Sequence, residues 1–246
     1  MATVARISTT PVKSLGLAHP ERVELTGRGV ADDRRFYLVD GARRLVGGVK
    51  HGPLVQVRPE WDGETLALAF PTGGRVEAPV ELGEPLTTDF YGKRDVRGRL
   101  VVGPWAEALS DFRGAELAVV RVDDDSFATD ICPATLVSDG SLAALGGLDG
   151  RRFRMLFELE GCAAFEEDGW DGSLVRAGAA LLRLAGPVPR CAVTTQDPTT
   201  GVRDHDTLRA IRAARGDSAD GQIYCGMYAE IVAPGAVAVG DAVTPV

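Results

Sequence analysis

Tight-turn residues recur through the first hundred residues, and this spacing constrains the possible folds most strongly. Asp62-Gly63 and Thr72-Gly73-Gly74 separate three short apolar segments, at 54–61, 64–70 and 75–80. Residues 34–46 join an aromatic-apolar run to a second run through a glycine-containing turn, which predicts a β-hairpin. A 3.6-residue period is missing before residue 104. The segment therefore predicts short antiparallel strands in a β-barrel or a small sandwich.

Helical spacing begins only after this region. It predicts three helices, at 104–114, 138–147 and 207–216, with strands between and after them at 115–122, 151–161, 172–191 and 223–246. We therefore expect a mixed, β-rich α+β fold with a few short helices. A boundary near residues 95–103 predicts two domains, residues 1–100 and residues 101–246.

Charge and short motifs exclude several classes of protein. The chain carries 27 Lys and Arg against 35 Asp and Glu, a net charge of −8, whereas nucleic-acid binders are usually basic. No apolar run approaches 18 residues and no leader-like segment is evident, so we expect a cytoplasmic protein without a membrane partner. The three histidines lack metal-ligand spacing, and no G-x-S-x-G, G-x-G-x-x-G or Walker loop occurs.

Cys191 differs in its surroundings from the other three cysteines. Free cysteines are often buried and only pack, which suits Cys162 and Cys225. Cys191 follows Arg190, whose charge favours a thiolate, and a rigid Pro-x-Pro turn. It precedes the loop-forming residues 194–201. These features predict either a nucleophile or a soft metal ligand.

Several basic and acidic side chains are further candidates. Arg and Lys residues occur at separate places in the sequence and would suit a phosphate-bearing ligand if the fold brought them together: Lys13 beside Ser14, Arg34, Arg35, Arg151, Arg152, Arg154 and Arg190. In the acidic segment 166–171 we expect a structural role for Trp170. Glu167 and Asp168 are expected in a turn or at the rim of a site.

Five motifs occur in an order typical of one family. They are "PVKS" at 11–14, "DRRFYLVD" at 33–40, "EDGW" at 167–170, "RCAVTTQDPTTG" at 190–201 and "YCGMYAEIVAPGAVAVGD" at 224–241. Together they resemble the MOSC family, with its N-terminal β-barrel domain in the first hundred residues. The resemblance implies a pterin–molybdenum cofactor (molybdopterin) with Cys191 as the metal ligand. It also implies cofactor contacts from Lys13, Ser14, Arg35, Arg154, Arg190 and Tyr228.

By the same resemblance we expect an oxidoreductase that reduces N-hydroxylated or other small oxidised substrates. Because this sequence has no four-cysteine ferredoxin segment, a separate flavoprotein or ferredoxin would supply the electrons. The chain departs from the family pattern at Leu156, where a polar residue is common, and at 45–52, which contains Lys50 and His51. These departures keep two alternatives open. Cys191 could act without metal as a sulfur carrier (persulfide) or covalent nucleophile, or the chain could bind and deliver the cofactor without catalysis.

Overall fold

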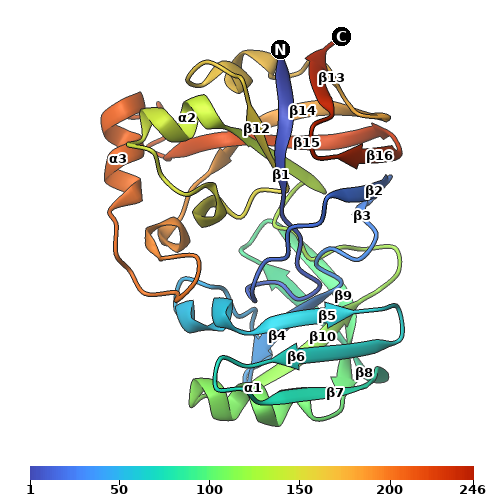
Figure 1. Cartoon of the computed structure of the whole chain (residues 1–246). Coiled ribbons are helices and arrows are strands. Elements are labelled where there is room, and N and C mark those ends of the chain that lie inside the picture. The colour runs from blue at the N-terminus through green and yellow to red at the C-terminus, as the bar shows by residue number, and fades with distance from the viewer.

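A closed barrel of seven strands forms the upper part of the molecule (Figure 1). The computed structural model describes residues 1–246. Neighbouring strands around the barrel are β1 (Ala2–Ile7), β12 (Phe157–Glu160), β11 (Ala134–Ser138), β15 (Tyr224–Ala233), β14 (Ala180–Pro189), β13 (Leu174–Ala177) and β17 (Ala242–Pro245).

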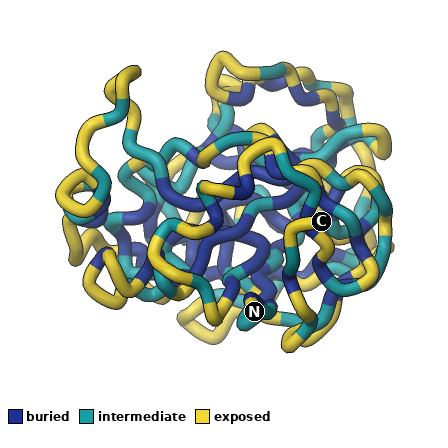
Figure 2. The backbone as a smooth tube through the Cα atoms, turned by 90° about the horizontal axis from the view of Figure 1, so that it is seen from above, coloured by how far each residue is buried: buried dark blue, intermediate teal, exposed yellow.

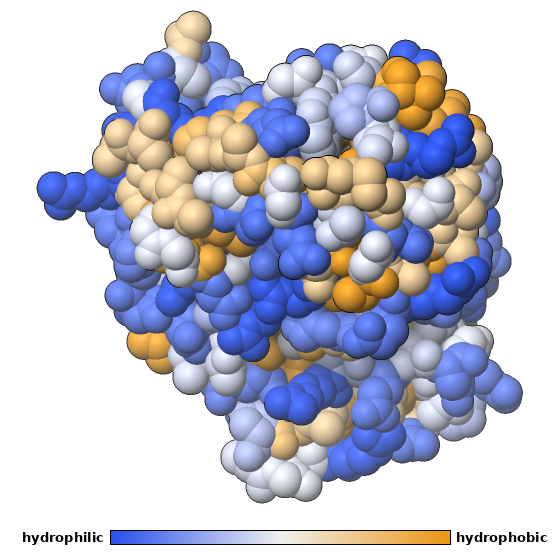
Figure 3. All heavy atoms as spheres, turned by 45° about the horizontal axis from the view of Figure 1, so that its top comes forward, coloured by the Kyte–Doolittle hydropathy of each residue, from blue (hydrophilic) through white to orange (hydrophobic).

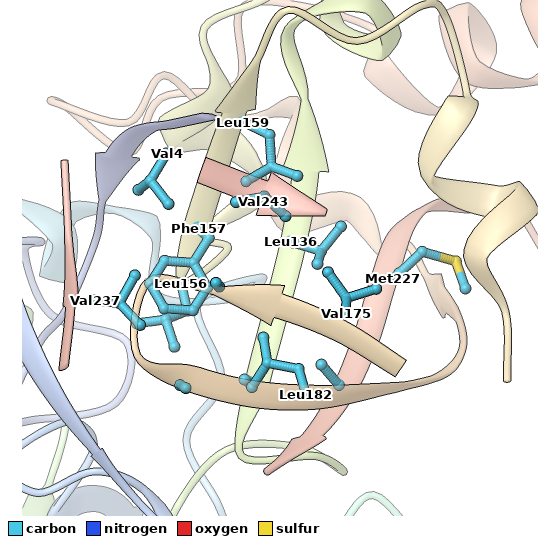
Figure 4. Packing of buried hydrophobic residues seen from close by; sticks show 14 of the residues in the cluster. Val4, Leu136, Leu156, Phe157, Leu159, Val175, Leu182, Met227, Val237 and Val243 are labelled. Carbon is cyan, nitrogen blue, oxygen red and sulfur yellow. The ribbon is translucent and has the colours of Figure 1, made fainter. Parts of the chain in front are cut away.

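The first strand closes this barrel. On one side β1 pairs antiparallel with β12, where Ile7 lies opposite Phe157, and on the other side Ala2 lies opposite Val243 of β17. Alternate side chains point inward and build an apolar interior, which includes Val4, Phe157 and Val243 (Figure 4). The two ends of the chain therefore meet in adjacent strands.

Two open sheets build the lower part of the molecule. One has the order β4 (Phe36–Asp40), β10 (Leu117–Val122), β9 (Arg94–Val102) and β8 (Glu81–Phe90). The other contains β5 (Arg58–Trp61), β6 (Thr65–Ala69) and β7 (Arg75–Pro79). A third, small sheet contains β16 (Gly235–Ala238), β2 (Arg22–Thr26) and β3 (Gly29–Val30), so it joins segments from the two ends of the sequence.

Helix α1 (Trp105–Arg113) packs on the lower sheets. It starts after Pro104 and stops at Gly114, which adopts the left-handed conformation that favours glycine. The fully buried Trp105 donates its indole N–H to the carbonyl of Leu66, 2.9 Å away. Helix α1 is thus anchored to β6 by both packing and a hydrogen bond.

The remaining helical segments lie in the second half of the sequence, except one. They are α2 (Asp139–Ala144) and α3 (Thr207–Arg215), with the 3-10 turns η1 (Gly52–Gln56), η2 (Gly150–Phe153), η3 (Glu166–Trp170) and η4 (Ala192–Thr195). No helix is long and apolar enough to span a membrane. Buried backbone concentrates in the middle of the molecule (Figure 2), and the face in Figure 3 shows apolar residues in small groups among hydrophilic ones.

The β-rich α+β class and the three helices are confirmed. Two segments differ from the predicted strands. Residues 54–56 belong to η1, which has a proline near its start, and residues 151–153 belong to η2, whose first turn is capped by the Asp149 carboxylate. The two-domain division at residues 100/101 stays a prediction. Strand pairing crosses it at several places, since β1 joins the upper barrel, β2 pairs with β16 and β10 pairs with β4.

Candidate functional site

A cavity lies where the lower sheets meet the barrel. Its empty space is about 1000 Å³ with the open mouth included. Residues from both halves of the sequence line it, and they include six of the side chains that the sequence singled out: Lys13, Ser14, Arg154, Arg190, Cys191 and Tyr228. The fold thus brings residues that are up to 215 positions apart to one concave surface.

The cavity wall carries an excess of positive charge. Four cations line it, Lys13, Arg34, Arg154 and Arg190, whereas Asp130 is the one carboxylate among the lining residues. A second carboxylate, that of Asp33, lies behind the wall and pairs with Arg34. Four cations against two carboxylates leave a net charge of about +2, which favours an anionic ligand.

Burial lowers the pKa of several of these cations, Lys13 and Arg154 among them. Burial lowers the pKa of Lys13, although its ion pair with Asp130 offsets part of this effect. Burial and the nearby charge of Arg34 lower the pKa of Arg154 to about 10. Taking these groups out of water has a cost in desolvation, which a bound anion would offset.

Arg190 has hydrogen-bonding capacity to spare. Its guanidinium donates to the carbonyl of Phe153 at 2.6 Å and lies 3.3 Å from the sulfur of Met155. Its Nε is buried and has no partner. The hydroxyl of Thr129, also in the cavity lining, is buried and unpaired as well. Unpaired buried atoms also occur at Arg6, Arg121, Asp168, Gln196 and Arg215, so the excess of positive charge is the stronger sign of a ligand site in this cavity.

Three lining residues adopt left-handed backbone conformations that are unfavourable for side chains with a Cβ. Ser14 has a φ of 75°, Arg34 of 49° and Arg154 of 54°. Arg34 and Arg154 stabilise this arrangement by donating to backbone carbonyls, those of Arg154 (3.1 Å) and Leu15 (2.6 Å) respectively. Such strained residues cluster at functional sites, where the surrounding structure over-determines them.

Cys191 is exposed at the edge of the cavity, directly before η4. The Thr194 amide and hydroxyl both donate to the Cys191 carbonyl, at 3.2 and 3.1 Å, so the turn after the cysteine is held by its own side chains. The thiol therefore projects from a fixed backbone position. By contrast, Cys225 is fully buried, and burial raises its pKa to about 11.

The loop after Cys191 docks on the segment that precedes η1. Gln196 donates to the carbonyls of Gly48 (3.0 Å) and Val49 (3.2 Å). Gly52 and Gly201 approach so closely that a Cβ on Gly52 would lie 2.1 Å from the Gly201 oxygen. Only glycine allows this approach, which places Gly48 and Val49 in the cavity wall.

Comparisons with known proteins identify the family of this chain. The family described as the MOSC domain matches residues 135–244, and the MOSC N-terminal beta barrel domain matches residues 1–99. The chain belongs to the MOSC family.

Among its curated relatives, human mitochondrial amidoxime reducing component 2 is 27% identical over 99% of this chain and 83% of the relative. Human mitochondrial amidoxime-reducing component 1 is 25% identical over 99% and 82%. The YUAD protein of Bacillus subtilis, a solved structure, is 12% identical over 99% of this chain and 94% of that chain, with a TM-score of 0.45.

Several predicted residues of this MOSC protein lie outside the cavity. Arg35 does not line it and pairs with Asp124 at 2.8 Å, while its neighbour Arg34 lines the wall. Lys50 and His51 do not line the cavity. Leu156 does line it, with its side chain buried beside the barrel interior, where a polar side chain would leave its hydrogen bonds unmade.

The acidic segment 166–171 serves the MOSC barrel rather than the cavity. Trp170 is buried in the barrel core, as the sequence indicated. Glu167 is fully buried and accepts hydrogen bonds from the residues that begin α2, and Asp168 pairs with Arg215 at 2.5 Å. None of the three lines the cavity.

Among the charged and phenolic side chains of the lining, Tyr91 and Asp130 had not been singled out, and Arg34 had been named only as a candidate for a phosphate-bearing ligand. Arg34 and Arg35 are adjacent in the sequence, and no sequence pattern indicates which of them lines the cavity. Asp130 lies in an irregular segment, and Tyr91 lies in the turn between β8 and β9. No local pattern marks either residue, because only tertiary structure brings them to the cavity.

Proposed function

We propose that this MOSC protein is a molybdenum-cofactor-dependent oxidoreductase that reduces N-hydroxylated or related small oxidised substrates. One observation carries the proposal: a net positive, partly unsatisfied cavity wall lies next to an exposed cysteine on a fixed turn. The names of the curated relatives, as amidoxime-reducing components, support the choice of substrate class.

The residues present fit a cofactor that carries a phosphate and a soft metal. Lys13, Arg154 and Arg190 would hold the anionic and hydrogen-bonding parts, with the unpaired Arg190 Nε as a free donor. Ser14 and Tyr228 would complete the pocket, and we assign to Arg34 the contact first expected of Arg35. When bound, the cofactor supplies two-electron redox chemistry at its metal.

Cys191 is the residue we assign to the metal. A thiolate is a soft ligand and suits molybdenum among sulfur donors. The chain has no cluster of three or more His, Cys, Asp or Glu side chains that could hold a metal ion by themselves. The remaining ligands would therefore come from the cofactor, and the turn around Thr194 would fix the sulfur in place.

Asp130 keeps the Lys13 ammonium in place. Partial desolvation raises the pKa of Asp130, but the charge and hydrogen bond of Lys13 outweigh it, so the pKa is lowered overall. The carboxylate is therefore ionised at neutral pH and holds Lys13 at the wall through their ion pair.

Electrons would come from a separate protein, a flavoprotein or a ferredoxin, and the substrate would be a small molecule. We propose no nucleic-acid or membrane partner. The cytoplasmic location also stays a prediction, and the human relatives are named as mitochondrial.

The decisive measurement is metal and pterin analysis of the chain purified from a molybdenum-replete host. We expect about one molybdenum per chain, strongly reduced in Cys191→Ser because the soft ligand is lost. Cys162→Ser is the matched control, since Cys162 lies outside the cavity lining. Reduction of benzamidoxime with an artificial electron donor should follow the molybdenum content.

Other results would identify the alternatives. Active protein without molybdenum or pterin would overturn the proposal, and a persulfide or covalent adduct on Cys191 by intact-protein mass spectrometry would then favour thiol chemistry. Bound cofactor without turnover, together with its transfer to an apo-enzyme, would indicate a delivery protein.

A further inference from the structure

The turn that joins β8 to β9 holds a tyrosine where the backbone favours other residues. Lys93 donates its amide to the carbonyl of Phe90 at 3.1 Å, which closes a four-residue turn. Tyr91 and Gly92 at its centre have φ values of 61° and 68°. This pattern of two positive φ angles is that of type I′ turns, whose first central position favours Asn, Asp or Gly.

The turn is locked in this conformation. The Asp89 carboxylate accepts from the Gly92 amide at 2.9 and 3.0 Å, so the strained tyrosine cannot relax by local rearrangement. Strain of this kind persists where the side chain has a use.

The Tyr91 side chain lies at the mouth of the cavity. It lines the cavity although 54% of the residue is exposed. Its hydroxyl lies over Gly47 on the facing segment, where an added Cβ would come within 2.8 Å of it. The ring therefore crosses from the β8–β9 turn to the segment that carries Gly48 and Val49.

The Tyr91 hydroxyl is available as a hydrogen-bond donor. The Tyr91 hydroxyl makes no hydrogen bond with the chain, and a tyrosine phenol has an ordinary pKa of about 10. The phenol is therefore protonated at neutral pH. The residues of the nearby cavity wall are small and apolar, and they include Gly48, Val49 and Val193.

We propose that Tyr91 contacts the substrate: its hydroxyl donates a hydrogen bond to the oxygen on the oxidised nitrogen, and its ring packs on a planar, compact substrate body. This inference rests on the proposed function and narrows its substrate class to small planar compounds with an N–O oxygen. Val49 and Val193 form an apolar part of the cavity wall beside the proposed position of the substrate.

The test compares two ligands that differ by one oxygen and, at neutral pH, by charge, since benzamidine is a cation and benzamidoxime is neutral; each variant is therefore compared with wild type on the same ligand. Binding of benzamidoxime and of benzamidine is measured by calorimetry on the cofactor-loaded full chain without an electron donor, for wild type and Tyr91→Phe. Loss of one hydrogen bond should weaken benzamidoxime binding about five- to tenfold and leave benzamidine binding unchanged. Tyr224→Phe, which removes a phenol outside the cavity lining, is the control.

Tyr91→Asn separates the turn from the contact. Asn suits the left-handed backbone, so this variant should melt at the same temperature as wild type or higher, and bind both ligands more weakly because the ring is gone. Cofactor content is measured in every variant and should not change.

The outcomes separate this inference from the proposed function. Equal effects of Tyr91→Phe on both ligands, or no effect on either, would overturn the substrate contact. Failure of wild type to bind benzamidoxime would overturn it too. Tyr91-dependent binding without reduction of benzamidoxime would uphold the contact and reject the oxidoreductase assignment.

Discussion

Two buried polar clusters in this protein differ in how completely their hydrogen bonds are made. Around Glu167, the amide of Ser138 and the hydroxyls of Ser138 and Ser141 all donate to one carboxylate, at 3.2, 2.7 and 2.7 Å. Around Arg190, a buried Nε stays unpaired and the neighbouring cations outnumber the carboxylates. The first cluster is complete without any ligand, whereas the second leaves donors free for one.

This difference shows why a buried charge alone does not identify a functional residue. Glu167 is fully buried and lies in a motif typical of the family, yet every partner it needs comes from the chain. The cavity cations are partly buried too, and what distinguishes them is unmatched charge and an unmatched donor. Loss of a member of each cluster should therefore affect different properties.

The largest effect is expected from Glu167→Ala. It leaves three donors of Ser138 and Ser141 without their acceptor, so the free energy of unfolding should fall by about 3 kcal/mol. Denaturant titration measures it, with the exposed Glu166→Ala as control. The cofactor content of the folded fraction should not change. A loss below about 1 kcal/mol would break the contrast between the clusters.

Arg190→Met should weaken cofactor binding and leave the stability of the fold nearly unchanged. We expect the cofactor to dissociate about 30- to 150-fold more readily, since a charge-assisted hydrogen bond contributes about 2–3 kcal/mol. Unfolding of the cofactor-free chain should change by less than about 1 kcal/mol, because an under-satisfied buried cation is removed. Molybdenum retained during dialysis measures the first effect and denaturant titration the second. Arg209→Met, on the exposed side of α3, is the control.

The smallest expected effect is on how the free energy of unfolding depends on pH. Burial lowers the pKa of Lys13 in the folded chain below its usual 10.5. Between the lowered value and 10.5 the unfolded chain binds more protons than the folded one, so Lys13 makes stability rise with pH in that window. Lys13→Met should remove this contribution, as seen in unfolding titrations at several alkaline pH values. An unchanged slope would show that Lys13 is not desolvated in solution.

The sequence predicted most of the fold because its signals are local. Gly114 marks the end of α1 through its left-handed backbone, and Ser138 caps α2 as expected from its position. Residues 151–153 could not be assigned in the same way. Their alternating pattern resembles a strand, but the cap from Asp149 and the left-handed Arg154 turn them into η2.

The candidate site was predictable only in part. The family resemblance pointed to Lys13, Arg154 and Cys191, and the fold brings all three to one cavity. Between Arg34 and Arg35 no sequence rule decides, because the positive φ of Arg34 interrupts the alternation of side chains just before β4. Asp130 lies in a segment without regular structure, so its pairing with Lys13 depends on tertiary contacts.

The position of β1 has a consequence for how the protein is made. Ala2 pairs with Val243, so the barrel cannot close on the ribosome until the last strand has emerged. Until then β1 has one exposed edge, which is a hazard for aggregation in a nascent chain. The cavity lining also extends to Tyr228 in β15, so its wall is complete only when nearly the whole chain has been made.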